Sequence, residues 1–134
     1  MDLTKALTIS ASGLTAQGTR MRVIAENLAN ANSTSSTSGD PYRRKVISFK
    51  SELDKQSGVN VVAVDRIGLD ESAFGKRYDP GHPSANADGY IKTSNVRSLI
   101  ESMDMREAQR SYEANLNMIS VTKDMLQRTI ELLR

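Results

Sequence analysis

Apolar residues near the start of the chain recur with the spacing of an amphipathic helix. The spacing alternates between four and three, and six of the eight positions on this stripe are apolar: Leu3, Leu7, Ser10, Leu14, Gln17, Met21, Ile24 and Leu28. A heptad spacing of this kind is typical of a helix that packs lengthwise against a second helix. Gly13 and Gly18 each disfavour the helical state by about 1 kcal/mol. We therefore predict that residues 1–30 form an amphipathic helix that depends on a packing partner.

The same spacing returns within residues 95–134. Apolar residues lie seven positions apart at Met105, Tyr112, Ile119, Leu126 and Leu133. A second line completes the heptad pattern at Gln109, Leu116, Lys123 and Ile130, and the apolar face is widened by Met118, Val121, Met125 and Leu132. Ser98 and Glu101 have the spacing of a capping box at the start of this segment. The pattern predicts one long helix with more apolar surface than the first helix can cover.

The segment between the two helical patterns has a different composition. Residues 31–41 are small and polar, which indicates a flexible loop. Residues 42–94 are expected to form a β-rich insert, because three short runs there have the composition of strands: Val46–Phe49, Val59–Val64 and Gly89–Ile91.

These patterns together predict a mainly α fold with a small β-rich insert, in which the N- and C-terminal heptad helices pair as an α-helical coiled coil. An apolar helix face that finds no partner within the chain normally marks an interface with another molecule. The expected assembly interface comprises Leu7, Leu14, Met21, Ile24, Leu28, Tyr112, Leu116, Ile119, Leu126, Ile130 and Leu133. The sequence therefore favours a subunit of a larger assembly.

The residue types that catalysis and metal binding need are scarce. The chain has no cysteine and a single histidine, His82, which lies between prolines and is interpreted as part of a structural turn. Glu101, Asp104 and Glu107 alternate with arginines, so we interpret them as a solvated helix face with ion pairs. Thiol chemistry and thiolate metal sites are excluded, and no nucleophile has an evident base. We predict a non-enzymatic protein that carries no cofactor and no metal.

Charge and hydropathy disfavour two further classes of function. The 18 basic residues nearly cancel the 16 acidic ones, which leaves a net charge of +2. The densest basic group, Arg43-Arg44-Lys45, would have to carry any binding of nucleic acid, which predicts a steep dependence of affinity on salt. No run of about 18 apolar residues is present, so insertion into a membrane is not expected. The first residues also lack the continuous apolar segment of a cleaved signal peptide.

Several short motifs resemble those of the bacterial flagellar rod and hook proteins. Asn27-Leu28-Ala29-Asn30 ends the first predicted helix, and Tyr42-Arg43 follows the polar loop. Tyr78-Asp79-Pro80-Gly81-His82-Pro83, followed by Gly89-Tyr90, is similar to the proximal rod members of this family. Arg110-Ser111-Tyr112-Glu113-Ala114-Asn115 resembles the motif of the family's C-terminal helix. The resemblance extends over essentially the whole chain.

This resemblance implies a structural subunit of the flagellar basal-body rod, located in the periplasm and exported by the flagellar type III apparatus without a cleaved signal. It implies helical polymerisation into a drive shaft that transmits motor torque. The implied partners are further copies of the chain, other proximal rod proteins, the adaptor between rod and membrane ring, and the distal rod protein.

A second hypothesis is a soluble helical adaptor or chaperone-like binding module. Such a protein would use the same Met-rich helix face to bind one partner in a small closed complex. It would have no need of the Asn-Leu-Ala-Asn and Asp-Pro-Gly-His-Pro motifs, so those motifs favour the rod subunit.

Overall fold

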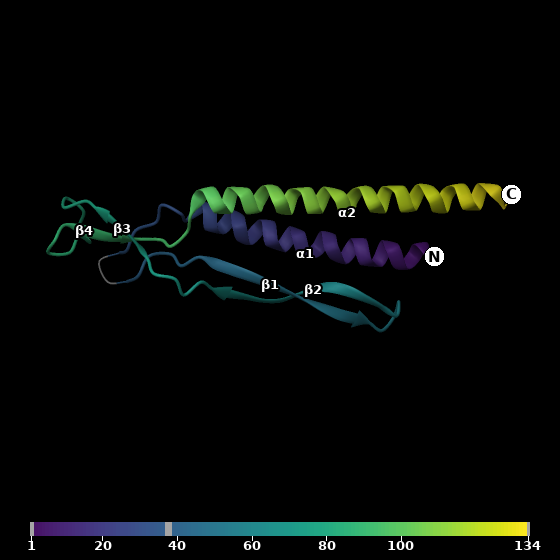
Figure 1. The fold of residues 1–134 in the computed structure, drawn as a ribbon, viewed down its shortest axis with the longest axis horizontal. Coiled ribbons are helices and arrows are strands. Elements are labelled where there is room, and N and C mark those ends of the chain that lie inside the picture. Colours follow the sequence, from purple (N-terminus) through teal and green to yellow (C-terminus); the bar gives the residue numbers. More distant parts are fainter. Residues whose placement is uncertain (1, 37–38, 134) are drawn as a thin grey trace. The chain divides into compact units, whose positions relative to one another are not determined.

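The computed structural model describes residues 2–36 and 39–133. The elements, in chain order, are α1 (Leu3–Ala29), β1 (Lys45–Asp54), β2 (Val59–Leu69), β3 (Gly75–Tyr78), β4 (Tyr90–Thr93) and α2 (Ser98–Leu132) (Figure 1). Two long helices and small antiparallel sheets confirm the predicted mainly α fold with a β-rich insert. None of the described helices combines the length and the apolar character that crossing a membrane requires.

The chain divides into two compact units. The first comprises Met1–Met21, Ile47–Arg66 and Arg106–Arg134, and the second comprises Arg22–Val46 and Ile67–Met105. Both long helices contribute residues to each unit.

In the first unit, α1 and α2 pack against each other in antiparallel orientation (Figure 1). The Asn115 side chain of α2 lies against Gly13 of α1, where an added Cβ would lie 2.8 Å from Oδ1 of Asn115. Further along, the guanidinium of Arg20 forms an ion pair with Glu107 at 3.2 Å. Small and polar side chains are buried in this unit: Ser10, Ala16, Ala108 and Thr122.

The predicted heptad stripe of α1 is correct, whereas that of α2 is only half correct. Every position of the α1 stripe is buried or half-buried, as are Tyr112, Ile119 and Leu126 of α2. The second predicted line of α2 is exposed, and Leu116 and Ile130 are 50% and 63% accessible. Its place is taken by a line one residue earlier, made of Ala108, Asn115 and Thr122. The close approach at Gly13 explains the difference, because it leaves room for small side chains and not for leucine.

The first unit also contains most of the β1–β2 hairpin, which is longer than the two strands predicted for it. Gly58 ends the connecting turn with a positive φ of 67°, and its N–H donates to the carbonyl of Asp54 at 2.7 Å. The Asp54 carboxylate accepts hydrogen bonds from the hydroxyl of Ser57 and the N–H of Gln56, and the Ser57 bond in particular lowers its pKa. A hydrogen bond from the Val62 N–H to the Ser12 hydroxyl joins β2 to α1.

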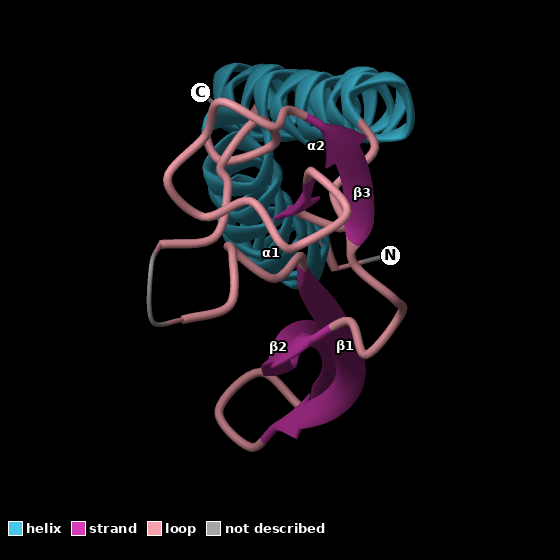
Figure 2. Cartoon of the chain, turned by 90° about the vertical axis from the view of Figure 1, so that its left-hand side faces the viewer, coloured by secondary structure: helices cyan, strands magenta, loops and turns pink. Residues whose placement is uncertain are grey.

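In the second unit, β3 and β4 form an antiparallel pair from Gly75↔Thr93 to Tyr78↔Tyr90 (Figure 2). The strand predicted at Gly89–Ile91 corresponds to β4, whereas β3 was not predicted. The other edge of β4 pairs with residues 33–35, since the Ser35 N–H donates to the carbonyl of Lys92 and the Ser94 N–H to that of Ser33, both at 3.1 Å. The start of the predicted flexible loop is therefore tied to β4, and its residues 37 and 38 lie outside the described residues.

Candidate functional site

Asn27, in the last turns of α1, is 1% exposed and makes four hydrogen bonds. Its amide nitrogen donates to the carbonyl of Lys45 at 2.9 Å and to Oε2 of Glu101 at 3.1 Å. Its amide oxygen accepts from the Tyr42 hydroxyl and the Lys45 N–H, both at 2.9 Å. The full hydrogen-bonding capacity of the amide is used. One side chain therefore joins the end of α1, the start of β1 and the first turn of α2.

Glu101 lies in that first turn and is also 1% exposed. Its Oε1 accepts a hydrogen bond from Nε of Arg44, whose guanidinium also pairs with Asp70 at 3.4 Å and with Asp104 at 3.7 Å. A buried carboxylate is tolerated where it is both paired and hydrogen-bonded. The prediction that Glu101 belongs to a solvated helix face and a capping box is therefore wrong, because the carboxylate turns inward to Arg44 and Asn27. We call Asn27, Tyr42, Arg44, Lys45 and Glu101 the polar junction.

Asn95 and Arg43 lie next to the polar junction and connect it by hydrogen bonds to the segment that follows β2. The Asn95 amide oxygen accepts from the Arg44 N–H at 2.7 Å, and its nitrogen donates to the carbonyl of Asp70 at 3.1 Å. The Arg43 guanidinium donates to the same carbonyl at 3.0 Å and lies 4.2 Å from the centroid of the Phe74 ring. The charges at 43 to 45 thus bind groups of their own chain, which further disfavours binding of nucleic acid.

The electrostatics of the junction keep its groups in the forms that these bonds need. The Lys45 ammonium donates to Glu26 at 2.7 Å, which lowers the pKa of Glu26 and raises that of Lys45. Burial raises the pKa of Tyr42, so its hydroxyl stays protonated and donates to Asn27. Burial, the largest single influence, acts to lower the pKa of Arg44, but the hydrogen bonds and charges of Glu101 and Asp70 together outweigh it and the pKa is raised.

The Asp-Pro-Gly-His-Pro motif forms the loop between β3 and β4. The Asp79 N–H donates to the carbonyl of Gly89 at 2.8 Å, and Gly89 has a positive φ of 78°. A Cβ at Gly89 would lie 2.9 Å from the Tyr78 ring, so only glycine fits. His82 sits in a turn, where its Nδ1 accepts from the Ser84 N–H at 3.1 Å. The exposed residues of the motif are Pro80, Gly81 and Pro83.

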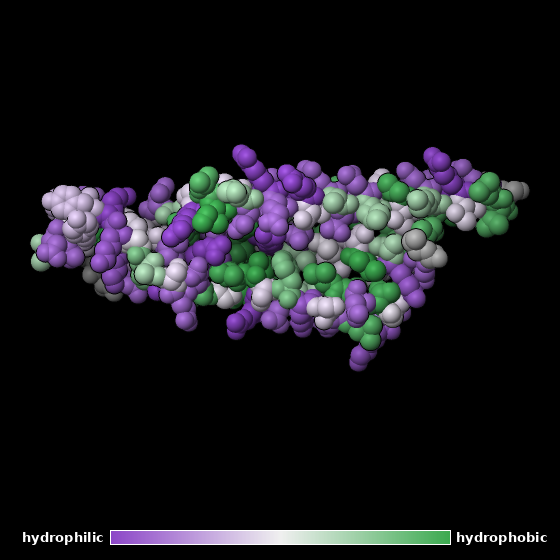
Figure 3. All heavy atoms as spheres, in the orientation of Figure 1, coloured by the Kyte–Doolittle hydropathy of each residue, from purple (hydrophilic) through white to green (hydrophobic). Residues whose placement is uncertain are grey.

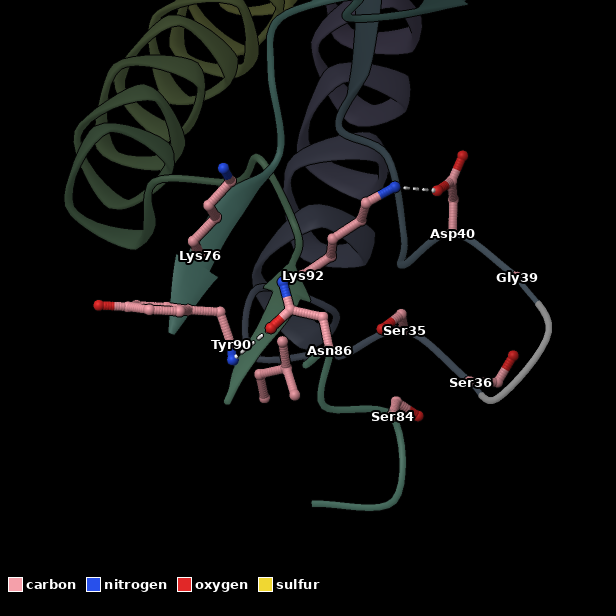
Figure 4. Close-up of a pocket in the computed structure, with 10 residues that line it drawn as sticks. Ser35, Ser36, Gly39, Asp40, Lys76, Ser84, Asn86, Tyr90 and Lys92 are labelled. Atoms are coloured by element: carbon pink, nitrogen blue, oxygen red, sulfur yellow. Dashed lines mark hydrogen bonds and ion pairs between the residues drawn. The ribbon is translucent and has the colours of Figure 1, made fainter. Parts of the chain in front are cut away.

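A hollow of about 600 Å³ lies beside β4 in the second unit. Its described lining residues are Ser35, Ser36, Gly39, Asp40, Lys76, Ser84, Asn86, Tyr90, Ile91 and Lys92. Figure 4 shows the Lys92 ammonium directed at Asp40, 3.3 Å away, and the Asn86 amide oxygen held by the Tyr90 N–H. The lining combines short hydroxyls, amides and charges, and the part of the chain that is described contains no cluster of metal-binding side chains. This hollow therefore offers no recognisable catalytic arrangement.

The apolar face of α2, continued by Leu133, lies within the first unit and is exposed on both sides of its contact with α1. Its large side chains are about half or more accessible: Leu116, Met118, Val121, Met125, Ile130, Leu132 and Leu133. Figure 3 shows the hydrophobic side chains that gather at the C-terminal end of α2. An apolar helix face of this size normally marks an interface.

The predicted interface residues divide into two groups. The buried or half-buried ones are Leu7, Leu14, Met21, Ile24, Leu28, Tyr112, Ile119 and Leu126. The exposed ones are Leu116, Ile130 and Leu133.

The sequence motifs in the two long helices contain both buried or half-buried and exposed residues. Asn30 donates from its amide to the carbonyl of Glu26 at 2.8 Å, while Ala29 is exposed. In the α2 motif, Asn115 donates to the carbonyl of Ser111 at 2.9 Å and contacts Gly13. The exposed residues of that motif are Arg110, Glu113 and Ala114.

Sequence reasoning missed three residues of the polar junction, Arg44, Lys45 and Glu101, and also Asn95 beside it. Glu101 had a usable signal, because it lies seven residues before Ala108 and so on the same helix face as the buried line. Arg44 and Asn95 had no such signal, since their partners are distant in the sequence.

Comparison with known proteins gives two family matches and several relatives. The family described as "Flagella basal body rod protein" matches residues 7–35, and "Flagellar basal body rod FlgEFG protein C-terminal" matches residues 87–132. A protein of Agrobacterium fabrum, named flagellar basal-body rod protein FlgC, is 52% identical and the match covers 98% of this chain and 96% of the relative. Proteins with the same name from Bacillus subtilis (40% identical, covering 94% and 95%) and Salmonella typhimurium (36% identical, covering 98% of both) are also similar.

Proposed function

Because the chain belongs to the FlgC family of flagellar basal-body rod proteins, and is thus a structural component of the rod, we propose that it polymerises helically and transmits motor torque across the periplasm. A rod requires subunits that leave surfaces open for the next subunit. The alternative of a small soluble adaptor is not favoured, since the relatives that match this chain over nearly its full length are named as rod proteins.

The observation that carries this proposal is the exposed apolar face of α2. Burying one large apolar side chain stabilises an interface by about 1.5–3 kcal/mol relative to leaving it in water. Seven such side chains lie on the exposed face. A subunit that uses two different surfaces for its neighbours makes contacts that do not close, and such contacts generate a helical assembly.

We propose further that the antiparallel pair of α1 and α2 forms the inner wall of the rod, with coiled-coil packing completed by neighbouring subunits. The neighbours are other copies of this chain, other proximal rod proteins, the adaptor to the membrane ring and the distal rod protein. The absence of cysteine suits export in an unfolded state by the type III apparatus without a cleaved signal. The role is structural, and no catalytic step is assigned to the chain.

A charge placed on the exposed face tests the proposal. In cells that use this chain as their rod subunit, Leu116→Asp is expected to abolish swimming in soft agar, because a carboxylate would have to be desolvated in the interface. The purified variant should keep the circular dichroism spectrum of the unmodified chain, since Leu116 is 50% exposed.

Asn117→Asp is the matched control, because it adds the same charge at a neighbouring exposed position outside the apolar face. It is expected to leave swimming nearly unchanged. Normal swimming of the Leu116→Asp cells would refute the proposed interface.

A further inference from the structure

The apolar side of α2 is wider than its contact with α1 and leaves an exposed flank on each side of that contact. We define the Leu flank as Leu116 and Ile130, and the Met flank as Met118, Val121 and Met125; each of these residues is about half or more accessible. Successive residues of an α-helix are rotated by about 100° about the helix axis. On this basis the two residues of the Leu flank lie about 40° apart around the axis, and the residues of the Met flank lie about 140–200° from Leu116. The two flanks therefore lie on roughly opposite sides of α2.

The polar residues that border the flanks differ in charge. Glu113 and Glu131 lie about 60° from Leu116 and border the Leu flank. Arg106 and Asp124 lie about 80° from Leu116 and cancel each other. Lys123 lies within the Leu flank, so this flank and its border carry a net charge of −1. This flank is therefore weakly acidic.

Arg110 and Arg128 lie about 120° from Leu116 and border the Met flank. Glu107 lies on the same side, but its carboxylate is paired with Arg20 of the same chain at 3.2 Å. The Met flank therefore presents a net positive border.

We propose that the Leu flank of one copy packs side by side against the Met flank of α2 in the next copy, a contact that rests on the proposed rod function. The opposite charges of the two borders favour this pairing, whereas Met flank against Met flank would bring arginines together. Methionine side chains adapt their shape and can fill the spaces around branched residues such as Leu116 and Ile130. Each added copy leaves one unused flank, so the contact repeats along the assembly.

Cysteine cross-linking tests this pairing, because the chain has no cysteine of its own. Two singly substituted chains, Leu116→Cys and one of Met118→Cys, Val121→Cys or Met125→Cys, are expressed together in cells that build rods from this protein. Purified basal bodies are treated with a bismaleimide that spans about 10 Å, the distance between packed helix axes. The expected result is a covalent dimer in at least one mixed pair, and loss of that dimer when either variant is present alone.

The control is the pair Asn117→Cys and Ser120→Cys, which lie between the flanks on the polar side and are expected to give no dimer. Dimers from Leu116→Cys alone would overturn the proposal in favour of a like-with-like contact. If Leu116→Cys weakens assembly, Ile130→Cys reports on the same flank.

The outcomes separate this inference from the proposed function. Basal bodies that contain the chain but yield no mixed dimer, with Leu116→Cys or with Ile130→Cys, would refute the flank pairing and leave the rod function intact. Basal bodies that lack even the unmodified chain would refute the rod function.

Discussion

A single buried amide, that of Asn27, connects the segments that meet at the polar junction. Asn27 and Tyr42 could be named from sequence, because both belong to motifs of the rod and hook proteins, and the structure joins them by a hydrogen bond of 2.9 Å. The pairing of Arg44 with Glu101 could not be predicted, because 57 residues separate them and no periodic pattern records such a contact. The spacing of Glu101 from Ala108 indicates its helix face, but it does not identify the partner of the carboxylate.

Asn27→Ala is expected to lower the free energy of unfolding by about 3 kcal/mol, since it leaves several buried groups without a partner. Asn30→Ala is the control, because Asn30 is half-buried and donates one hydrogen bond, to Glu26, so its loss should cost about 1 kcal/mol. Urea denaturation of the purified chain measures both. Equal losses for the two variants would contradict the role assigned to Asn27.

At the scale of secondary structure, the pairing of α1 with α2 depends on the contact between Gly13 and the Asn115 side chain. Heptad spacing predicted both helices close to their observed bounds, Leu3–Ala29 and Ser98–Leu132. It did not predict which side of α2 would face α1, because an apolar face this wide offers several possible lines of contact. The close approach at Gly13 selects the line through Asn115. Strand β3 was missed because its sequence, Gly-Lys-Arg-Tyr, has no β-branched residue, whereas β4, which is equally short, contains isoleucine and threonine.

The two glycines of α1 provide a test of this packing. Gly18 has no atom within 4 Å of an added Cβ, so Gly18→Ala is expected to stabilise the chain by about 1 kcal/mol through helix propensity. Gly13→Ala gains the same propensity but pushes against the Asn115 amide at 2.8–2.9 Å, so we expect a net loss of about 1 kcal/mol. Thermal unfolding followed by circular dichroism compares them, and equal stabilisation by both substitutions would show that the helices do not pack closely at Gly13.

For the whole molecule, sequence and structure agree that the isolated chain leaves much of its apolar surface uncovered. Its fully buried apolar residues are few and mostly small, while leucine, isoleucine and methionine side chains of α2 remain accessible. Composition predicted this, because the chain has no tryptophan and only 4% aromatic residues. The identity of the covering surface could not be predicted from one chain, since we propose that this surface belongs to neighbouring subunits of the rod.

The most direct test of the account is quantitative mass spectrometry of basal bodies purified from the source organism after the outer filament has been removed. We predict that the chain is recovered with the other rod proteins in a constant ratio to them, as expected for a structural subunit. Well-formed basal bodies that lack the chain would contradict the account.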